Sequence, residues 1–375
     1  MRSRSFAAVF IGTLAFLLAS ALAWAGPPVR VLVDEVGPDA LMQMNGPHRG
    51  YVNGVLSFST PLTLIWPLQA VGQQVYIDGT PVGQSFTLEP TDGAPLYWGE
   101  KSYRGALRFV AVDGGFRVIN VLDLETYLRG VVPAEMQASW PLEALKAQAI
   151  AARTYTLASL SPNADFDVCA TTECQKYKGA LAEHPQSDQA ILDTAGLVLT
   201  YQGDFAKTYY HADSGGALAS SAEVWDEVRP YLVSQQDVAH SSPHRSWERG
   251  IDPAAVARSL AARGADVGEV RSIRILAYSA SGRVDSIEVA GAAGNTVLSG
   301  TDLTKLLRGW GLKSTRFNMT GDLRARGDGW GHGVGMSQYG ARSLAQAGYS
   351  YDQILAFYYP NTDLSKIAYE GTSSP

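Results

Sequence analysis

The sequence has 375 residues, of which 46% are hydrophobic and 18% are charged, a composition typical of globular proteins that argues against intrinsic disorder. Its formal charge is −6 at pH 7, and it carries no block of lysine and arginine, so we expect no nucleic-acid partner. A neutral polymer such as a glycan is compatible with this charge.

The N-terminus has the pattern of a secretory signal. Two arginines precede an apolar run from Phe6 to Leu22, and the tripeptide "AWA" ends at Ala25. This pattern predicts a signal peptide over residues 1–25 and export to the periplasm or cell envelope. Because the apolar run is long for a signal, an uncleaved N-terminal anchor is the alternative. No later segment is apolar enough to predict a further membrane span.

Residues 27–115 have the pattern of a β-rich module. Short apolar and β-branched runs, among them "VRVLV", "TLIWPL", "QVYIDG" and "ALRFVAV", alternate with glycine, proline and Asp-Gly pairs. Runs of this length between turn residues predict hairpins rather than helices. We interpret this module as a scaffold.

Strands and helices interleave over residues 116–362. The clearest predicted helix is "PLEALKAQAIAARTYTLAS", residues 141–159, in which apolar residues recur at three- and four-residue spacing. This order has no regular strand-helix-strand alternation and predicts an α+β fold. Residues 363–375 are interpreted as a C-terminal tail. Further helices are predicted at 186–194, 252–264, 301–309 and 340–360, with a break at Gly348, and hairpins at 197–213 and 272–291.

The two cysteines, Cys169 and Cys174, lie close together in "DVCATTECQKY". In an exported protein, cysteines with this spacing most simply form a small disulfide. A zinc site is the alternative, and it would need further ligands from Asp167, Glu173 and His184.

The segment "YHADSGG", residues 210–216, contains "DSGG", which resembles the nucleophile segment of chymotrypsin-like proteases. Such a serine needs a histidine base and an orienting carboxylate. The histidines upstream, His48 and His184, lie in unrelated contexts, so we reject the protease interpretation. Two interpretations of the segment remain: it is either a polar strand that ends in a Gly-Gly turn or a segment that lines a substrate site.

The loop "GWGHGVGMSQYG", residues 329–340, places five glycines around His332. Glycine permits positive φ and close backbone approach, so the loop is expected to be tight and to touch another group. It matches no phosphate-binding motif. His332 is either a functional imidazole or a buried, hydrogen-bonded one.

Glu135, in "VVPAEM", is the candidate general acid. Its apolar neighbours would disfavour the ionised form of the carboxyl, as a general acid requires. The alternative is an exposed glutamate that a helix dipole favours. Aromatic and amide side chains in the segments 175–177, 209–214 and 330–339 suit sugar binding if they converge in space.

Several of these motifs occur in the order of a known family. From about residue 120 to 360, "GVVPAEMQASWPLEALKAQAIAARTYTL", "DVCATTECQKYKG", "YYHADSGG" and "GWGHGVGMSQYGARSLAQAGYSYDQILAFYYP" resemble the stage II sporulation protein D (SpoIID/LytB) family. Its members are peptidoglycan lytic transglycosylases or, in the LytB branch, enhancers of cell-wall amidases. The resemblance implies that residues 116–362 form a mixed α/β catalytic domain with a glycan-binding cleft. A non-catalytic cell-wall binding protein or amidase enhancer is the alternative.

The resemblance also implies the site residues. The catalytic glutamate of the family motif falls on Glu135, which would protonate the glycosidic oxygen and then take the proton of the C6 hydroxyl, giving 1,6-anhydro-N-acetylmuramic acid. His332 would orient the sugar or Glu135. The residues expected to bind the glycan strand are Arg153, Gln175, Tyr177, Tyr210, His211, Ser214, His332, Ser337, Gln338 and Tyr339.

The family bears on cofactors and partners as well. Many members have histidine before the second cysteine, and some bind zinc there, whereas this chain has Glu173. That difference favours a disulfide between Cys169 and Cys174 over zinc, and no cofactor is expected. The implied partners are peptidoglycan glycan strands and a cell-wall amidase.

Overall fold

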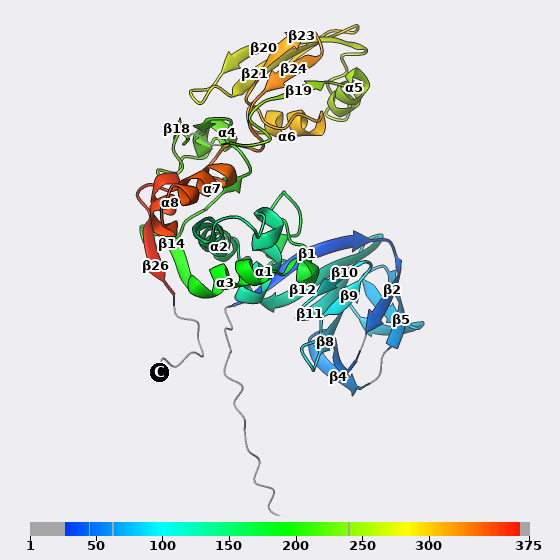
Figure 1. The fold of residues 1–375 in the computed structure, drawn as a ribbon. Coiled ribbons are helices and arrows are strands. Elements are labelled where there is room, and N and C mark those ends of the chain that lie inside the picture. Colours follow the sequence, from blue (N-terminus) through cyan, green and yellow to red (C-terminus); the bar gives the residue numbers. More distant parts are fainter. Residues whose placement is uncertain (1–26, 45, 62–63, 239–240, 368–375) are drawn as a thin grey trace, which may run out of the picture.

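The computed structural model describes residues 27–44, 46–61, 64–238 and 241–367. It has an α+β fold, as predicted, with a strand-rich N-terminal part, a helical centre and a second mixed part at the far end (Figure 1). The predicted signal peptide lies outside the described residues, as does most of the predicted tail. None of the helices in the described ranges is long and apolar enough to cross a membrane.

The N-terminal part consists of two sheets that share one hydrophobic core. A seven-stranded sheet has the order β13-β1-β12-β11-β8-β3-β4, and a six-stranded sheet has the order β10-β9-β2-β5-β6-β7. The predicted β-rich module is therefore present, and its last strand extends beyond residue 115. The strands are β1 (Pro28–Val36), β2 (Asp39–Met44), β3 (His48–Val52), β4 (Val55–Thr60), β5 (Leu64–Val71), β6 (Gln74–Ile77), β7 (Thr80–Gly83), β8 (Ser85–Pro90), β9 (Leu96–Trp98), β10 (Lys101–Tyr103), β11 (Ala106–Val112) and β12 (Gly115–Asp123).

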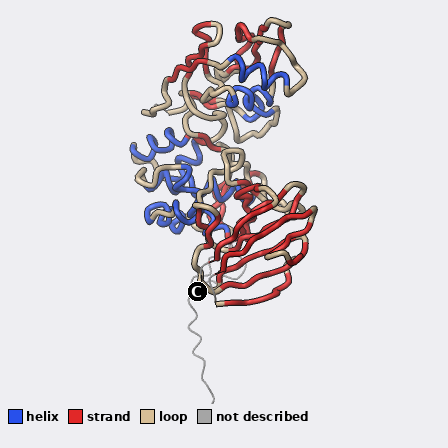
Figure 2. The backbone as a smooth tube through the Cα atoms, turned by 90° about the vertical axis from the view of Figure 1, so that its right-hand side faces the viewer, coloured by secondary structure: helices blue, strands red, loops and turns tan. Residues whose placement is uncertain are grey.

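The central region is built around one buried helix, α2, which packs against α1, α3, α7, α8 and β14. Figure 2 shows these helices gathered beside the strands of the N-terminal sheets. The helices are α1 (Leu124–Glu135), α2 (Leu142–Leu157), the 3-10 turn η1 (Gly179–Ala182), α3 (Pro185–Asp193), α4 (Ser221–Trp225), α7 (Gln338–Gln346) and α8 (Tyr351–Tyr358). The strands are β13 (Val168–Cys169), β14 (Leu197–Tyr201), β15 (Asp204–Phe205), β16 (Tyr210–His211), β17 (Ala217–Leu218), β18 (Gln235–Gln236), β25 (Met336–Ser337) and β26 (Asp363–Lys366).

Helix α1 follows β12 directly and was not predicted. The Asp123 side chain caps it by accepting a hydrogen bond from the Thr126 N–H at 3.0 Å. Gly130 and Pro133, which usually disfavour a helix, both lie inside it. A side chain at Gly130 would collide with the ring of Tyr177, so close packing requires the glycine.

Residues 247–327 form a second hydrophobic core, which we call the inserted subdomain. It lies within the range 116–362 that the sequence analysis treats as one domain, and it occupies the top of Figure 1. Its two sheets have the orders β19-β24-β23 and β20-β21-β22. The elements are β19 (Trp247–Gly250), α5 (Pro253–Ala261), β20 (Val270–Tyr278), β21 (Val284–Gly291), β22 (Asn295–Ser299), α6 (Thr301–Gly309), β23 (Phe317–Gly321) and β24 (Arg324–Gly327).

Two strand pairings differ from the predictions. The expected hairpin over 197–213 is short, because the chain leaves β14 after Phe205 and β16 pairs instead with β25, in parallel. Residues 363–366 are not a free tail, since β26 pairs with β14. The pairing of Tyr210 with Met336 brings "YHADSGG" beside the glycine loop.

Candidate active site

Glu135 is the last residue of α1, and its side chain is 7% exposed. One carboxyl oxygen accepts the Lys176 backbone N–H at 2.7 Å, and the other accepts the Gln338 amide at 3.2 Å. The Lys176 ammonium lies 3.6 Å from the second oxygen. Within the described ranges, the polar contacts of this carboxyl are thus all with donors, which stabilise its negative charge. We predicted apolar surroundings from the neighbours in sequence, but Val131, Val132 and Met136 are buried in the hydrophobic core instead.

The N-terminus of α7 fixes Gln338. The Ser337 hydroxyl caps this helix by accepting the Gly340 N–H at 3.2 Å. The Gln338 amide is shared between Glu135 and the Gln148 side chain, 3.3 Å away on α2. Gln338, on α7, therefore links Glu135 on α1 to Gln148 on α2.

Cys169 and Cys174 form a disulfide, which closes the loop immediately before Gln175 and Lys176. Gln175 is buried and donates to the Thr156 hydroxyl at 2.8 Å, while its carbonyl oxygen accepts the Tyr210 hydroxyl at 2.7 Å. These bonds hold the backbone that presents the Lys176 N–H to the carboxylate. No group of three or more histidine, cysteine or acidic residues suited to a metal occurs among the residues described.

His332 uses both ring nitrogens inside the protein. Nδ1 accepts the Val334 N–H at 3.0 Å, and Nε2 donates to the Tyr210 carbonyl at 3.1 Å. Burial, together with the nearby Arg283 guanidinium, lowers the pKa of His332 to about 3, so the ring is neutral at neutral pH. We therefore assign His332 the hydrogen-bonded, structural role, in which it positions the backbone of Tyr210.

Other parts of the protein pack closely against two glycines of the loop. Gly333 has φ of +86°, and a side chain there would occupy the position of the Arg283 guanidinium. Gly331 has φ of +116°, and a Cβ there would lie 2.7 Å from the Cβ of His211. The group that these two glycines touch therefore belongs to the protein, because they let the inserted subdomain and β16 approach.

Arg283 is the side chain that the inserted subdomain contributes to this packing. It is 2% exposed and donates to the Ser214 carbonyl at 2.8 Å. Burial is the largest cause that lowers its pKa, to about 10, and Arg316 adds to the effect. The inserted subdomain is thus joined to the "DSGG" turn through a buried cation.

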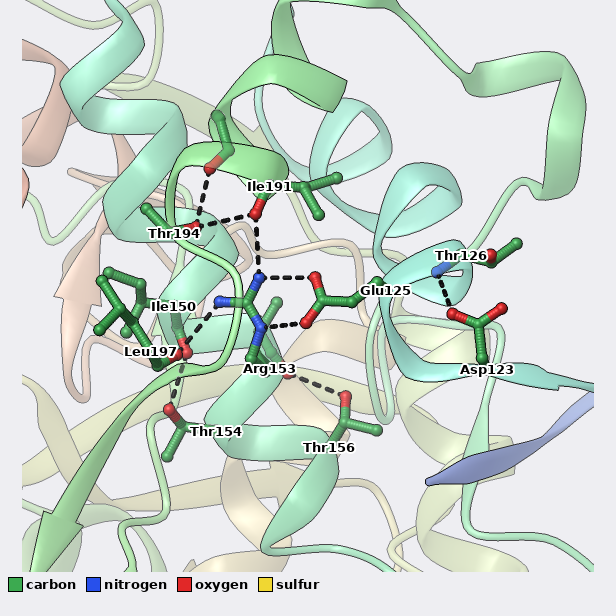
Figure 3. Close-up of polar contacts among 12 residues, drawn as sticks. Asp123, Glu125, Thr126, Ile150, Arg153, Thr154, Thr156, Ile191, Thr194 and Leu197 are labelled. Atoms are coloured by element: carbon green, nitrogen blue, oxygen red, sulfur yellow. Dashed lines mark hydrogen bonds and ion pairs between the residues drawn. The ribbon is translucent and has the colours of Figure 1, made fainter. Parts of the chain in front are cut away.

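Arg153 differs most from its expected role. It is fully buried on α2, and its guanidinium donates two hydrogen bonds of 2.7 Å to the Glu125 carboxylate (Figure 3). The remaining donors reach the carbonyls of Leu197 and Ile191, at 3.1 and 3.4 Å. Arg153 has no exposed surface with which to contact a glycan, and we assign it a structural role.

Several other residues that we expected to bind the glycan strand are also buried. The Tyr177 hydroxyl donates to Asn120 at 2.7 Å, and the Ser214 hydroxyl donates to Asp237 at 2.6 Å. His211 is buried, with Nδ1 3.1 Å from the Val334 carbonyl. Together with Gln175 and the helix-capping Ser337, these residues shape the site from behind rather than lining it. The structure brings together Glu135, Tyr210, His332, Gln338 and Tyr339.

Two residues of this site are not among those that we expected to bind the glycan strand. Lys176 contacts Glu135 through its backbone and its ammonium, and its neighbour Gln175 was selected from the same motif. Gln148 is fully buried in the otherwise small and apolar "AQAIAA" stretch of α2. A lone amide in such a stretch was a usable signal, because a buried polar group needs a partner.

Comparisons with known proteins identify the same family that the motifs resemble. Residues 112–201 match the model of a family described as stage II sporulation protein (SpoIID). Residues 226–335, which include the inserted subdomain, match the model of a domain of unknown function (DUF8618). The second match gives no activity for that part of the chain.

Several curated relatives are similar to the chain. An uncharacterised protein of Brachyspira hyodysenteriae is 30% identical over 90% of this chain and 92% of its own length. The amidase enhancer of Bacillus subtilis is 31% identical over 64% of this chain, a match that covers 40% of that protein. Stage II sporulation protein D of Bacillus subtilis is 30% identical over 65% of this chain and 75% of its own length. The chain belongs to the stage II sporulation protein D family.

Proposed function

We propose that this protein is an exported peptidoglycan lytic transglycosylase, which cleaves the bond between N-acetylmuramic acid and N-acetylglucosamine. The observation that carries the proposal is the site around Glu135, where one nearly buried carboxyl receives donors from two motifs distant in sequence. The names of the relatives, stage II sporulation protein D and amidase enhancer, support the coarser statement of a cell-wall role. The apolar N-terminal run supports export.

In the proposed reaction, protonated Glu135 gives its proton to the glycosidic oxygen as the bond to C1 of N-acetylmuramic acid breaks. The resulting carboxylate then takes the proton of the C6 hydroxyl of the same sugar. The C6 oxygen attacks C1 and closes the 1,6-anhydro ring, so the proton returns to Glu135 and no water is consumed. The Lys176 N–H and the Gln338 amide orient the carboxyl and stabilise its charge between the two steps.

The second candidate function is the enhancement of a cell-wall amidase without turnover of the glycan. The similarity to an amidase enhancer favours it. In that case the site around Glu135 would hold a strand, and a partner amidase would perform the hydrolysis. The two functions differ in whether the proton of Glu135 is needed.

The test is Glu135→Gln, which keeps the shape of the side chain and one of its two acceptor oxygens but removes the titrating proton. General acid-base catalysis contributes about 10²–10⁴-fold, so release of 1,6-anhydro products should fall by that factor. Mass spectrometry of products from purified glycan strands gives the rate. Glu173→Gln, at a side chain that is 68% exposed, is the matched control and should leave the rate unchanged.

Three outcomes separate the alternatives. Reducing-end products formed by addition of water would contradict the single-carboxyl reaction. A wild-type rate in Glu135→Gln would remove Glu135 from the chemistry. If wild type releases no product, yet it and Glu135→Gln accelerate a partner amidase equally, the enhancer function is correct.

A further inference from the structure

A row of aromatic rings leads away from Gln338. Tyr339, the next residue, lies 4.9 Å from Trp140 and 5.7 Å from His244, measured between ring centroids. His244 in turn lies 4.4 Å from Trp330. Trp330 ends the row with 47% of its surface exposed. The row therefore connects the site around the catalytic carboxyl to an exposed indole at the edge of the inserted subdomain.

Backbone hydrogen bonds fix this far end. The Gly329 N–H donates to the His244 carbonyl at 2.8 Å, and the Gly331 N–H donates to the Lys313 carbonyl at 2.9 Å. Trp330, between the two glycines, exchanges backbone bonds of 2.8 and 3.0 Å with Asp213. The three side chains of His244, Lys313 and Trp330 are thus held together before any ligand binds, as a preorganised binding site requires.

The chemistry of these side chains suits a charged sugar. The Lys313 ammonium lies 5.1 Å from the centroid of the Trp330 ring. An exposed indole offers an apolar face for the C–H groups of a pyranose. Lys313 makes no ion pair with a carboxylate in the ranges that the structure describes, so its charge is available for an anionic substituent.

We infer that Trp330, Lys313 and His244 form a distal glycan subsite that takes a pyranose bearing a carboxylate, such as the lactyl group of N-acetylmuramic acid. The inference rests on the proposed function for the identity of the polymer. Trp330 stacks on the sugar, Lys313 pairs with its carboxylate, and His244 packs against the indole with the two ring planes at 83°. All three lie within residues 226–335, and the inference therefore gives this region a role in holding the strand.

The experiment measures binding in a Glu135→Gln background, in which turnover does not consume the ligand. The two probes are peptide-free peptidoglycan strands, which carry lactyl carboxylates, and oligomers of N-acetylglucosamine, which carry none. Trp330→Ala should weaken binding of both probes by about tenfold, because the indole loses its stacking partner. The control is Tyr349→Ala, at a ring 46% exposed and outside the row, which should bind both probes like the background protein.

Lys313→Met tests the charge separately. It should weaken binding of the carboxylate-bearing strands several-fold, roughly as expected for one charge-assisted contact, and leave the uncharged oligomers unaffected. The difference should shrink in high salt, which screens exposed charges. Equal losses on both probes, or none on either, would overturn the assignment of Lys313.

Trp330→Ala binding as tightly as Tyr349→Ala would overturn the subsite, as would a background protein that binds neither probe. If Trp330→Ala does not fold, Trp330→Leu takes its place with the same expectation. The proposed function can fail separately. If wild type binds through Trp330 but releases no anhydro product, the subsite is supported and the transglycosylase reaction is contradicted. If Trp330→Ala releases product with an unchanged KM, the reaction is supported and the subsite is contradicted.

Discussion

The two ends of helix α1 each carry a nearly buried glutamate, and the two carboxyls have different partners. Glu125, in the first turn, accepts two hydrogen bonds from Nε and Nη2 of Arg153, which is fully buried. Glu135, at the last position, accepts the Lys176 backbone N–H and the Gln338 amide, and it lies 3.6 Å from the ammonium of Lys176, a side chain that is 43% exposed.

The difference separates a structural charge from a chemically available one. A buried carboxylate with a bidentate cation depends on that cation, because losing either partner leaves the other desolvated and uncompensated. A carboxyl held mainly by neutral donors, with its cation at the surface, depends less on any one partner. We therefore expect substitutions at the first end of α1 to cost stability and substitutions at the second end to cost activity.

The largest expected effect on stability is that of Arg153→Met. Removing the guanidinium leaves Glu125 buried without its cation, which should lower the free energy of unfolding by about 3–5 kcal/mol. Denaturant unfolding followed by circular dichroism measures the loss. The double variant Glu125→Leu/Arg153→Met should recover part of it, since neither charge remains buried.

The surface pair of Arg274 and Glu288, at 3.0 Å, provides the control. The Arg274 side chain is 69% exposed, so Arg274→Met should cost less than about 1 kcal/mol. A similar loss in Arg274→Met and Arg153→Met would break the comparison, because burial would then not matter.

Gly333→Ala tests the packing of the glycine loop that precedes Gln338, the partner of Glu135. The new methyl group would displace the Arg283 guanidinium at a backbone with positive φ, so we expect a loss of about 2–3 kcal/mol in the free energy of unfolding. Gly114→Ala is matched, with φ of +87° and no atom within 4 Å of the added Cβ. The free energy of unfolding of Gly114→Ala should fall by about 1 kcal/mol. Equal losses would show that the backbone alone, and not Arg283, requires glycine at position 333.

His332 makes stability depend on pH. Its pKa falls from 6.5 to about 3 on folding, so between these values the unfolded chain binds a proton that the folded chain does not. Stability should therefore decrease as the pH falls from about 6.5 towards 3, by up to about 1.4 kcal/mol per pH unit. His332→Asn keeps one acceptor and one donor but does not titrate, so it should reduce this slope in denaturant unfolding between pH 8 and 4. Part of the slope should remain, because burial also holds the pKa of His211 well below its ordinary value. His184→Asn, at an exposed ring, should leave the slope as it is in wild type.

Lys176→Met should have the smallest effect. It removes an exposed ammonium 3.6 Å from Glu135 but leaves the backbone N–H bond of 2.7 Å intact, so the free energy of unfolding should change by less than about 1 kcal/mol. The same denaturant unfolding measures it. A loss as large as that of Arg153→Met would mean that Glu135 needs its cation as Glu125 does, and the two ends of α1 would be alike.

Local sequence patterns were sufficient for most elements away from α1. The predicted helices at 141–159 and 301–309 correspond to α2 and α6, and the predicted break at Gly348 separates α7 from α8. These patterns work because periodicity and turn residues act over a few neighbouring positions. Helix α1 was missed for the same reason: Gly130 and Pro133 are locally unfavourable, and packing against Tyr177 and the rest of the core outweighs them.

The sequence by itself determined the family, the α+β class and Glu135 as the candidate acid, because short motifs and the order of elements can be read directly along the chain. Only the tertiary structure decided which motif residues are available to a ligand and which are buried and hydrogen-bonded to other protein groups. Arg153 meets a carboxylate 28 positions away, and Gln338 reaches Glu135 over 203 positions. Burial and hydrogen-bond partners depend on such distant contacts, so identical residue types in neighbouring motifs can be structural in one case and available for chemistry in the other.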